Sequence, residues 1–428
     1  MRVRNGWPVA LLAGTLVLGG CGGDGGSGRE DSADERPAEE SPEPAGPPTE
    51  FATEPAARID TGPITHPPLV VHGERAWVAD EAGLNLVDLT TGRATARVDT
   101  EEPARYEPWR AEGATTPEEE AAAAEQAAAT RRVVAPLLAE LDGEPAVLAA
   151  IPVGDDSAPE LELVAAHAET GDVLARVPFT PAFWREEAPD GQVSARVVSV
   201  HEGLVAIQPA DGNQLAGAVV VDLARREVAW ESDDFALMAG HGDTLAGVAS
   251  RDDGSATVGV ALADGREVWS DPIAGAPSLQ PMGRLFRIQE SEDPAGPRLV
   301  ETATGEPVIT ADDGLAKDMT CTPPDPEITA VVCDNEESGA LAFDLESGEV
   351  LWRQPAGEAG RDGTWSGEVT ASYRDRIYLD RDGRPVVLDA RSGEVVAADS
   401  GVAPQVVAPG AALIAAGDHV DIHPARTD

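Results

Sequence analysis

A turn motif that recurs along most of the chain limits the fold more than any other feature. In each copy an apolar run meets an acidic residue, then a turn that usually closes on Gly, then a second apolar run. Asp favours such a turn because its carboxylate accepts backbone N–H groups two residues on, and Gly adopts the left-handed conformation without strain. Each copy therefore predicts a β-hairpin. The copies begin at Leu86, Val164, Val221, Ala261, Glu301, Asp344 and Asp389.

The spacing of these turns predicts a β-propeller. The positions equivalent to the closing Gly are 226, 265, 305, 348 and 393, which are 39, 40, 43 and 45 residues apart. Two further apolar segments precede each turn, so each unit has four strands, named A to D in chain order. Units of about 40–45 residues with four strands are typical of propeller blades.

The best copy, Asp344 to Trp352, places a Trp four residues after the closing Gly, as Trp230 and Trp269 are placed in two other copies. We expect this Trp to dock against the neighbouring blade. An Asp-x-x-Thr-Gly-x-x-x-Trp turn with this period resembles the PQQ-like (pyrroloquinoline-quinone-like) β-propeller repeat. The resemblance covers roughly residues 56–424 and extends to the outer-membrane-assembly propeller lipoproteins, although Arg226 replaces the Gly in one copy.

The two ends of the chain predict how the ring closes. The last segment has three apolar runs, at 405–407, 412–414 and 419–422, and lacks a fourth strand. Residues 56–61 resemble the D strand at 95–100, so we predict that they complete the last blade and remove two exposed sheet edges. The fold is then all-β, an eight-bladed β-propeller of four-stranded blades. Seven blades is the alternative.

The N-terminus is typical of an exported lipoprotein. Arg2 and Arg4 precede a short apolar stretch, as in a secretory signal, and this stretch is too short to cross about 30 Å of hydrocarbon. It ends in Leu18-Gly19-Gly20-Cys21, which resembles a bacterial lipobox and implies a signal peptide over 1–20 and an acylated Cys21. An ordinary signal with an incidental cysteine is the alternative. Residues 21–55 are acidic and rich in Gly, Pro and Ser, which predicts a disordered tether.

Three insertions, at 101–131, 179–192 and 353–367, fall between a D strand and the next A strand. Alternating strand directions place all such loops on one face of the disc. The first insertion contains a predicted α-helix near 117–130, with Thr116 as its N-cap and Pro117 at its first position. Aromatic side chains gather in the insertions although aromatics are only 4% of the chain. They are either recognition anchors or fasteners for the loops, and the candidate partner-binding residues are Tyr106, Trp109, Trp184 and Trp365.

Acidic loops and scattered histidines offer no strong metal site. The B–C loops carry carboxylates at Asp155, Glu290, Asp334 and Asp380, but none completes a calcium-binding loop, so we expect a solvated acidic rim. His72, His201 and His241 fall at A–B turns of different blades. We interpret them as turn residues and predict no metal.

Cys321 and Cys333 lie at equal distances from Glu327, so a hairpin would bring them opposite each other on strands A and B. In an exported protein this favours a disulfide, with two buried thiols as the alternative. The chain has no adjacent cysteine pair. The quinoprotein dehydrogenases that the repeat resembles carry such a vicinal disulfide near the quinone.

The net charge and the motifs together exclude some classes of function. With 77 Asp and Glu against 31 Lys and Arg, the net charge of -46 excludes nucleic-acid binding. We predict a monomeric, non-catalytic scaffold without cofactor, held by lipid on the outer face of the bacterial cell membrane, with a protein partner that carries a basic segment. The alternatives are small-molecule or glycan binding in the central funnel, or a quinone- or metal-dependent oxidoreductase.

Overall fold

The computed structural model divides the chain into two units, 1–44 and 45–428, and describes most of the second. The described residues are 46–61, 67–80, 83–102, 134–155, 158–186, 193–211, 214–215, 217–251, 254–273, 277–290, 296–322, 329–357 and 364–426. Among them, no helix is both long and apolar enough for a membrane span. The predicted tether up to 45 and the predicted helix near 117–130 lie outside the described residues.

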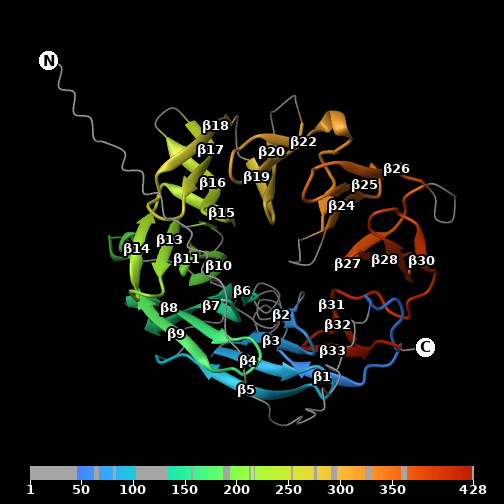
Figure 1. Ribbon diagram of the computed structural model, residues 1–428, viewed down its shortest axis with the longest axis horizontal. Coiled ribbons are helices and arrows are strands. Elements are labelled where there is room, and N and C mark those ends of the chain that lie inside the picture. The colour runs from blue at the N-terminus through green and yellow to red at the C-terminus, as the bar shows by residue number, and fades with distance from the viewer. Residues whose placement is uncertain are drawn as a thin grey trace, which may run out of the picture. The chain divides into compact units, whose positions relative to one another are not determined.

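Eight antiparallel sheets stand around a common axis and form a closed ring (Figure 1), which confirms the eight-bladed propeller and rules out seven blades. Seven blades follow the chain, with strand A innermost and strand D at the outer edge. The only helical turns described are α2 (Ala182–Glu186) and a 3-10 turn at Ala311–Asp313.

The strands of the first four blades have the following bounds. Blade 1 is β2 (Leu69–His72), β3 (Arg75–Asp80), β4 (Gly83–Asp88) and β5 (Arg93–Asp99). Blade 2 is β6 (Leu137–Leu141), β7 (Glu144–Asp155), β8 (Ala158–His167) and β9 (Val173–Phe179). Blade 3 is β10 (Val193–His201), β11 (Leu204–Asp211), β13 (Ala218–Asp222) and β14 (Glu227–Ser232), with β12 (Gln214–Leu215) beside β11. Blade 4 is β15 (Phe235–His241), β16 (Thr244–Arg251), β17 (Gly254–Ala261) and β18 (Glu267–Ile273).

The remaining blades complete the ring. Blade 5 is β19 (Pro277–Met282), β20 (Leu285–Glu290), β21 (Arg298–Glu301) and β22 (Pro307–Ile309). Blade 6 is β23 (Thr320–Cys321), β24 (Ala330–Asn335), β25 (Gly339–Asp344) and β26 (Val350–Gln354). Blade 7 is β27 (Glu368–Tyr373), β28 (Arg376–Arg381), β29 (Arg384–Asp389) and β30 (Val395–Ala397). Blade 8 is β31 (Val406–Ala408), β32 (Ala411–Ala415), β33 (His419–Pro424) and β1 (Ala57–Asp60).

The C–D turns have the local structure that their sequence predicts. In blade 1, Asp88 Oδ1 accepts hydrogen bonds from the backbone N–H and the hydroxyl of Thr91, both at 2.9 Å. Gly92 then closes the turn with φ +66°. Asp344 and Ser347 repeat this arrangement in blade 6. Arg226 adopts the same left-handed conformation, with φ +57°, which explains how that copy forms without Gly.

Tryptophans on the D strands of blades 3, 4 and 6 fasten these blades to the next, as predicted. The indole N–H groups of Trp230, Trp269 and Trp352 donate to backbone oxygens in the following blade, over 2.7, 2.9 and 2.8 Å. In blade 1 the D strand has Ala96 instead, and Trp77 of strand B supplies the equivalent bond to Ala168 O, at 2.8 Å. The hydrophobic clusters likewise lie mostly between adjacent blades.

The N-terminal strand completes blade 8, as predicted. β1 pairs with β33 in the register Ala57↔Ile422 to Asp60↔His419. The part of the chain that packs against the ring begins earlier than expected. Residues 46–55, which the sequence assigns to the tether, also lie against the ring. The side chain of Phe51 is fully buried, and its ring centroid is 5.9 Å from that of Tyr378. The Tyr378 hydroxyl donates to Pro48 O at 2.6 Å. We call residues 46–60 the N-terminal strap.

Candidate functional site

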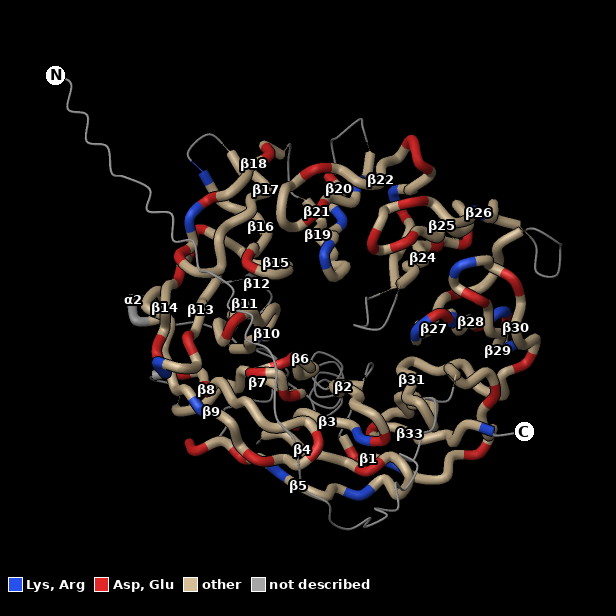
Figure 2. The backbone as a smooth tube through the Cα atoms, viewed as in Figure 1, with Lys and Arg blue, Asp and Glu red and all other residues tan. Residues whose placement is uncertain are grey.

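The two faces of the ring differ in what they carry. The A–B and C–D turns form one face, here called the turn face, and the B–C and D–A loops form the insertion face. The insertions follow β5, β9 and β26, which are all D strands, so the topology places their starts on the insertion face. Acidic residues lie all around the ring, with fewer basic residues among them (Figure 2).

The predicted recognition aromatics that the structure describes are buried. Trp365 is 0% exposed and Trp184 is 5% exposed, so of the two alternatives these residues fit fasteners for the loops and are not exposed recognition anchors. The Trp365 ring lies 6.1 Å from the ring of Trp352, and the Trp184 ring lies 6.2 Å from that of Phe183. In a chain with few aromatics, burying these large rings is what holds the insertions to the blades. Tyr106 and Trp109 lie outside the described residues.

Trp365 closes the base of the third insertion. Its backbone N–H donates to Pro355 O at 2.7 Å, and its carbonyl accepts from Gly357 N–H at 3.0 Å. A parallel bridge joins Ala356 to Trp365. The loop is therefore pinned where it leaves blade 6 and enters blade 7.

Asp334 lies under this loop and is partly buried, so it is not part of a solvated acidic rim. Burial raises the pKa of its carboxyl to about 6, and the nearby charge of Glu368 also raises it. The backbone N–H of Val369 lowers the pKa, as does the indole N–H of Trp365, which acts from beyond ordinary hydrogen-bond geometry. Sequence reasoning missed this site because the blade 6–blade 7 contact is not visible in the local pattern.

Glu290 is a second loop carboxylate that the structure buries. It is 6% exposed and accepts a 2.8 Å bond from Arg298, which also binds Asp271 of blade 4 at 2.9 Å. This network ties blade 4 to blade 5. The expected acidic rim is thus partly structural.

The cysteine pair lies where the hairpin prediction placed it. Cys321 and Cys333 are direct cross-strand partners on β23 and β24, and they form a disulfide that is fully buried. Gln280 of blade 5 donates to Cys321 O at 2.9 Å. The bond lies in the inner part of blade 6, where it braces the A and B strands.

His72, His201 and His241 lie at A–B turns on the turn face, as predicted. His72 Nε2 is 3.8 Å from Glu169 Oε1, and His167 Nε2 is 3.7 Å from Glu144 Oε2. His201 and His241 end the adjacent strands β10 and β15. Within the described ranges, no group of three or more His, Cys, Asp or Glu side chains is arranged to hold a metal ion.

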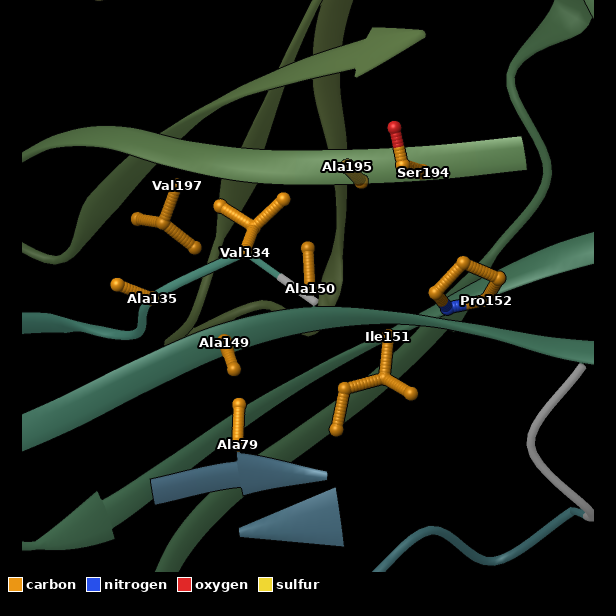
Figure 3. A pocket seen from close by; sticks show the side chains of 10 residues that line it. All are labelled: Ala79, Val134, Ala135, Ala149, Ala150, Ile151, Pro152, Ser194, Ala195 and Val197. Carbon is orange, nitrogen blue, oxygen red and sulfur yellow. The ribbon is translucent and has the colours of Figure 1, made fainter. Parts of the chain in front are cut away.

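A small cavity lies among β3, β7 and β10 (Figure 3). Its volume is about 20 Å³, which is room for about one water molecule. The lining is almost entirely aliphatic, and the hydroxyl of Ser194 is its one polar side-chain group. The cavity has the size and chemistry of a packing gap between blades.

The strand order defines the chain as an eight-bladed β-propeller. No family model matches the sequence, and no curated protein matches it. Solved structures with a similar fold include BamB from Moraxella catarrhalis, at 12% identity and a TM-score of 0.44, covering 86% of this chain and 99% of that one. The computationally designed Ika8 protein has 12% identity and a TM-score of 0.46, covering 87% and 97%. Dihydro-heme d1 dehydrogenase NirN in complex with DHE has 18% identity and a TM-score of 0.40, covering 79% and 65%.

Proposed function

We propose that this protein is an exported, lipid-anchored, non-catalytic scaffold of the PQQ-like propeller type, held on the outer face of the bacterial cell membrane, where it binds a protein partner as a monomer. The observation that carries the proposal is the lipobox-like sequence ending at Cys21. The strap supports it, because the chain that leads from Cys21 enters the ring at blade 8 and is fastened there by Phe51 and β1. A pull on the lipid anchor would thus act on a closed, rigid body.

The charge of the chain supports a basic partner segment. The net charge is -46, and acidic residues are distributed around the ring (Figure 2). Complementary charge mainly accelerates association and makes binding sensitive to salt. Partner capture should therefore weaken as ionic strength rises, since the Debye length shortens to about 8 Å at 0.15 M.

The anchor is tested by fractionating cells that produce the wild type or Cys21→Ser. The wild type should stay with the membranes in high salt without detergent, and the variant should appear in the soluble fraction or the medium. Membrane association of the variant under these conditions contradicts the lipid anchor.

The scaffold role is tested by zero-length carbodiimide crosslinking on intact cells, followed by mass spectrometry. This reagent joins carboxylates to amines, which suits a chain with 77 acidic residues, and Lys317 is its only lysine. A crosslinked species that joins these carboxylates to lysines of one partner, and that declines with salt, supports the proposal. Absence of any reproducible partner at low ionic strength contradicts it.

A further inference from the structure

Three basic or protonatable side chains meet on the turn face at three consecutive blades. His201 is the last residue of β10, and His241 is the last residue of the neighbouring strand β15. Arg284 lies in the turn between β19 and β20 of the next blade, and β19 lies beside β15. His201 and His241 lie on A strands, and Arg284 lies in the turn that follows an A strand. The A strands line the inside of the ring (Figure 1). The three side chains therefore share the inner rim of one face.

None of these three side chains makes a hydrogen bond or ion pair with another described residue, and Arg284 Nε is buried without a partner. Carboxylates that could pair with such groups are abundant, because acidic residues outnumber basic ones by 77 to 31. Buried donors without acceptors are costly, so such a group calls for an explanation. Eight other described arginines do bind a carboxylate, namely Arg58, Arg97, Arg176, Arg225, Arg251, Arg298, Arg376 and Arg391. The Nε groups of Arg196, Arg287, Arg376 and Arg381 are also buried without a partner.

Most carboxylates near His201, His241 and Arg284 accept hydrogen bonds from other side chains. Glu301 Oε2 accepts the Thr304 hydroxyl at 3.1 Å, and Asp243 Oδ1 accepts the Thr244 hydroxyl at 3.1 Å. Glu202, at the β10–β11 turn, is exposed. Desolvation lowers the pKa of His241, Arg284 and His201 lower it further, and Glu301 raises it. The side chains are thus near enough to influence one another, and the net effect disfavours a positive charge on His241.

We propose that His201, His241 and Arg284 form a binding site for a phosphate-type oxyanion at the inner rim of the turn face. The guanidinium supplies a fork of N–H donors and the two imidazoles supply one or two each. A phosphate group offers three or four oxygens pointing in different directions, against the two coplanar oxygens of a carboxylate, so it can accept from donors on three blades at once. The site is independent of the proposed scaffold function and of the lipid anchor.

Phosphate binding at this site should be coupled to protonation of His241. A loose ionic contact would not show this coupling. An anion that binds beside His241 favours the protonated imidazole, so it raises the pKa of His241, and protonation in turn strengthens binding. Affinity for phosphate should therefore increase as the pH falls through the range in which His241 titrates.

The experiment is calorimetric titration of the full chain with inorganic phosphate at pH 6.0 and 8.0, at constant ionic strength set with chloride. We expect saturable binding at pH 6.0 that weakens about tenfold at pH 8.0 and about tenfold or more in Arg284→Gln, from the loss of one charge-assisted contact. Arg266→Gln is the matched control, because Arg266 is an exposed arginine of the C–D turn of blade 4 on the same face. It should bind as the wild type does. A parallel titration with glycerol phosphate shows whether the site takes a phosphate monoester or only free phosphate.

His241→Gln and His201→Gln keep the test decisive if Arg284→Gln does not fold, since both positions are turn-proximal and His241 is exposed. Each should weaken binding, and His241→Gln should also reduce its pH dependence. NMR of the wild type should show the pKa of the His241 imidazole rising when phosphate binds. Absence of saturable binding at pH 6.0, or equal loss in Arg284→Gln and Arg266→Gln, would overturn the site.

Discussion

At the residue scale, contacts between blades rely on a tryptophan that lies against a glycine. Gly305 has φ +72°, and a Cβ added there would come within 2.7 Å of the Trp269 ring. The same pairing joins Gly265 to Trp230. Gly at these positions therefore serves both the turn and the interface.

Gly305→Ala should lose more stability than backbone strain alone explains. Gly73→Ala is the matched control, because Gly73 also has a positive φ, +58°, but nothing lies within 4 Å of its added Cβ. Strain should cost each variant about 1–2 kcal/mol, and the clash with Trp269 should cost Gly305→Ala about 1–3 kcal/mol more. Urea denaturation measures both. Equal losses of stability in the two variants would show that the Trp269 indole moves aside at no energetic cost.

Asp334 should make the stability of the protein depend on pH in an unusual direction. In the native state its pKa is about 6, against an ordinary value of 3.8, so the native state retains the proton over a range in which the unfolded chain has released it. Its contribution to stability is therefore present below about pH 4 and is lost as the pH rises through 6. Asp344, whose pKa is lowered to about 2, acts in the opposite direction.

Asp334→Asn isolates this contribution by difference, because Asn keeps an acceptor for Val369 N–H and carries no charge. The variant should melt at a higher temperature than the wild type at pH 7.5, and the difference should vanish toward pH 4. Melting curves at four or five pH values measure it. A constant difference across that range would mean that Asp334 does not titrate in the native state as described.

At the scale of the elements, the repeat spacing predicted the seven blades that follow the chain. The likeness of residues 56–61 to the D strand at 95–100 predicted the eighth, with seven blades as the alternative, and the equal spacing of Cys321 and Cys333 from Glu327 predicted their hairpin. Contacts between blades were harder to predict from the sequence. The bond from Trp77 to Ala168 replaces the missing Trp at Ala96, and only the three-dimensional arrangement shows this substitution. The sequence left open whether Trp184 and Trp365 are recognition anchors or fasteners for the same reason, since a loop aromatic can face solvent or the neighbouring blade with the same local sequence.

The strap shows a further limit of sequence patterns. Residues 46–55 have the composition of the tether that precedes them, and Phe51 is the one aromatic among them. Phe51 is the one buried side chain of the segment, and it packs with Ala371, Tyr378 and Val407 of blades 7 and 8. Backbone hydrogen bonds to blade 8 and its neighbours, such as Phe51 N–H to Ser400 O, add to this anchor. Composition averages over a window and cannot register one such anchor.

Phe51→Ala should destabilise the whole ring, by about 3–5 kcal/mol for a fully buried aromatic. Val395→Ala on the outer strand β30 is the control, because Val395 is 53% exposed, and it should change stability by less than about 0.5 kcal/mol. Chemical denaturation followed by tryptophan fluorescence compares them. If Phe51→Ala unfolds like the control, the strap is not part of the cooperative unit.

At the scale of the whole molecule, the two ends of the chain meet in one blade. β1 supplies the outer strand of blade 8, and along the sequence the proposed acylation site, Cys21, precedes it. The ring therefore has no separate terminal edge at this point, and any force on the N-terminus is borne by blade 8. Closure by β1 is the claim on which the architecture and the proposed anchoring both rest.

Disulfide trapping tests this closure most directly. Arg58 and Asp421 are cross-strand partners in β1 and β33, and their exposed ion pair contributes little to stability. In a Cys21→Ser background, Arg58→Cys with Asp421→Cys should form a disulfide readily on mild oxidation, whereas Ile59→Cys with Asp421→Cys, displaced by one residue, should not. Closure by β1 predicts a bridge between residues 58 and 421 in the natively folded protein. Absence of that bridge, or equal trapping of both pairs, would contradict it.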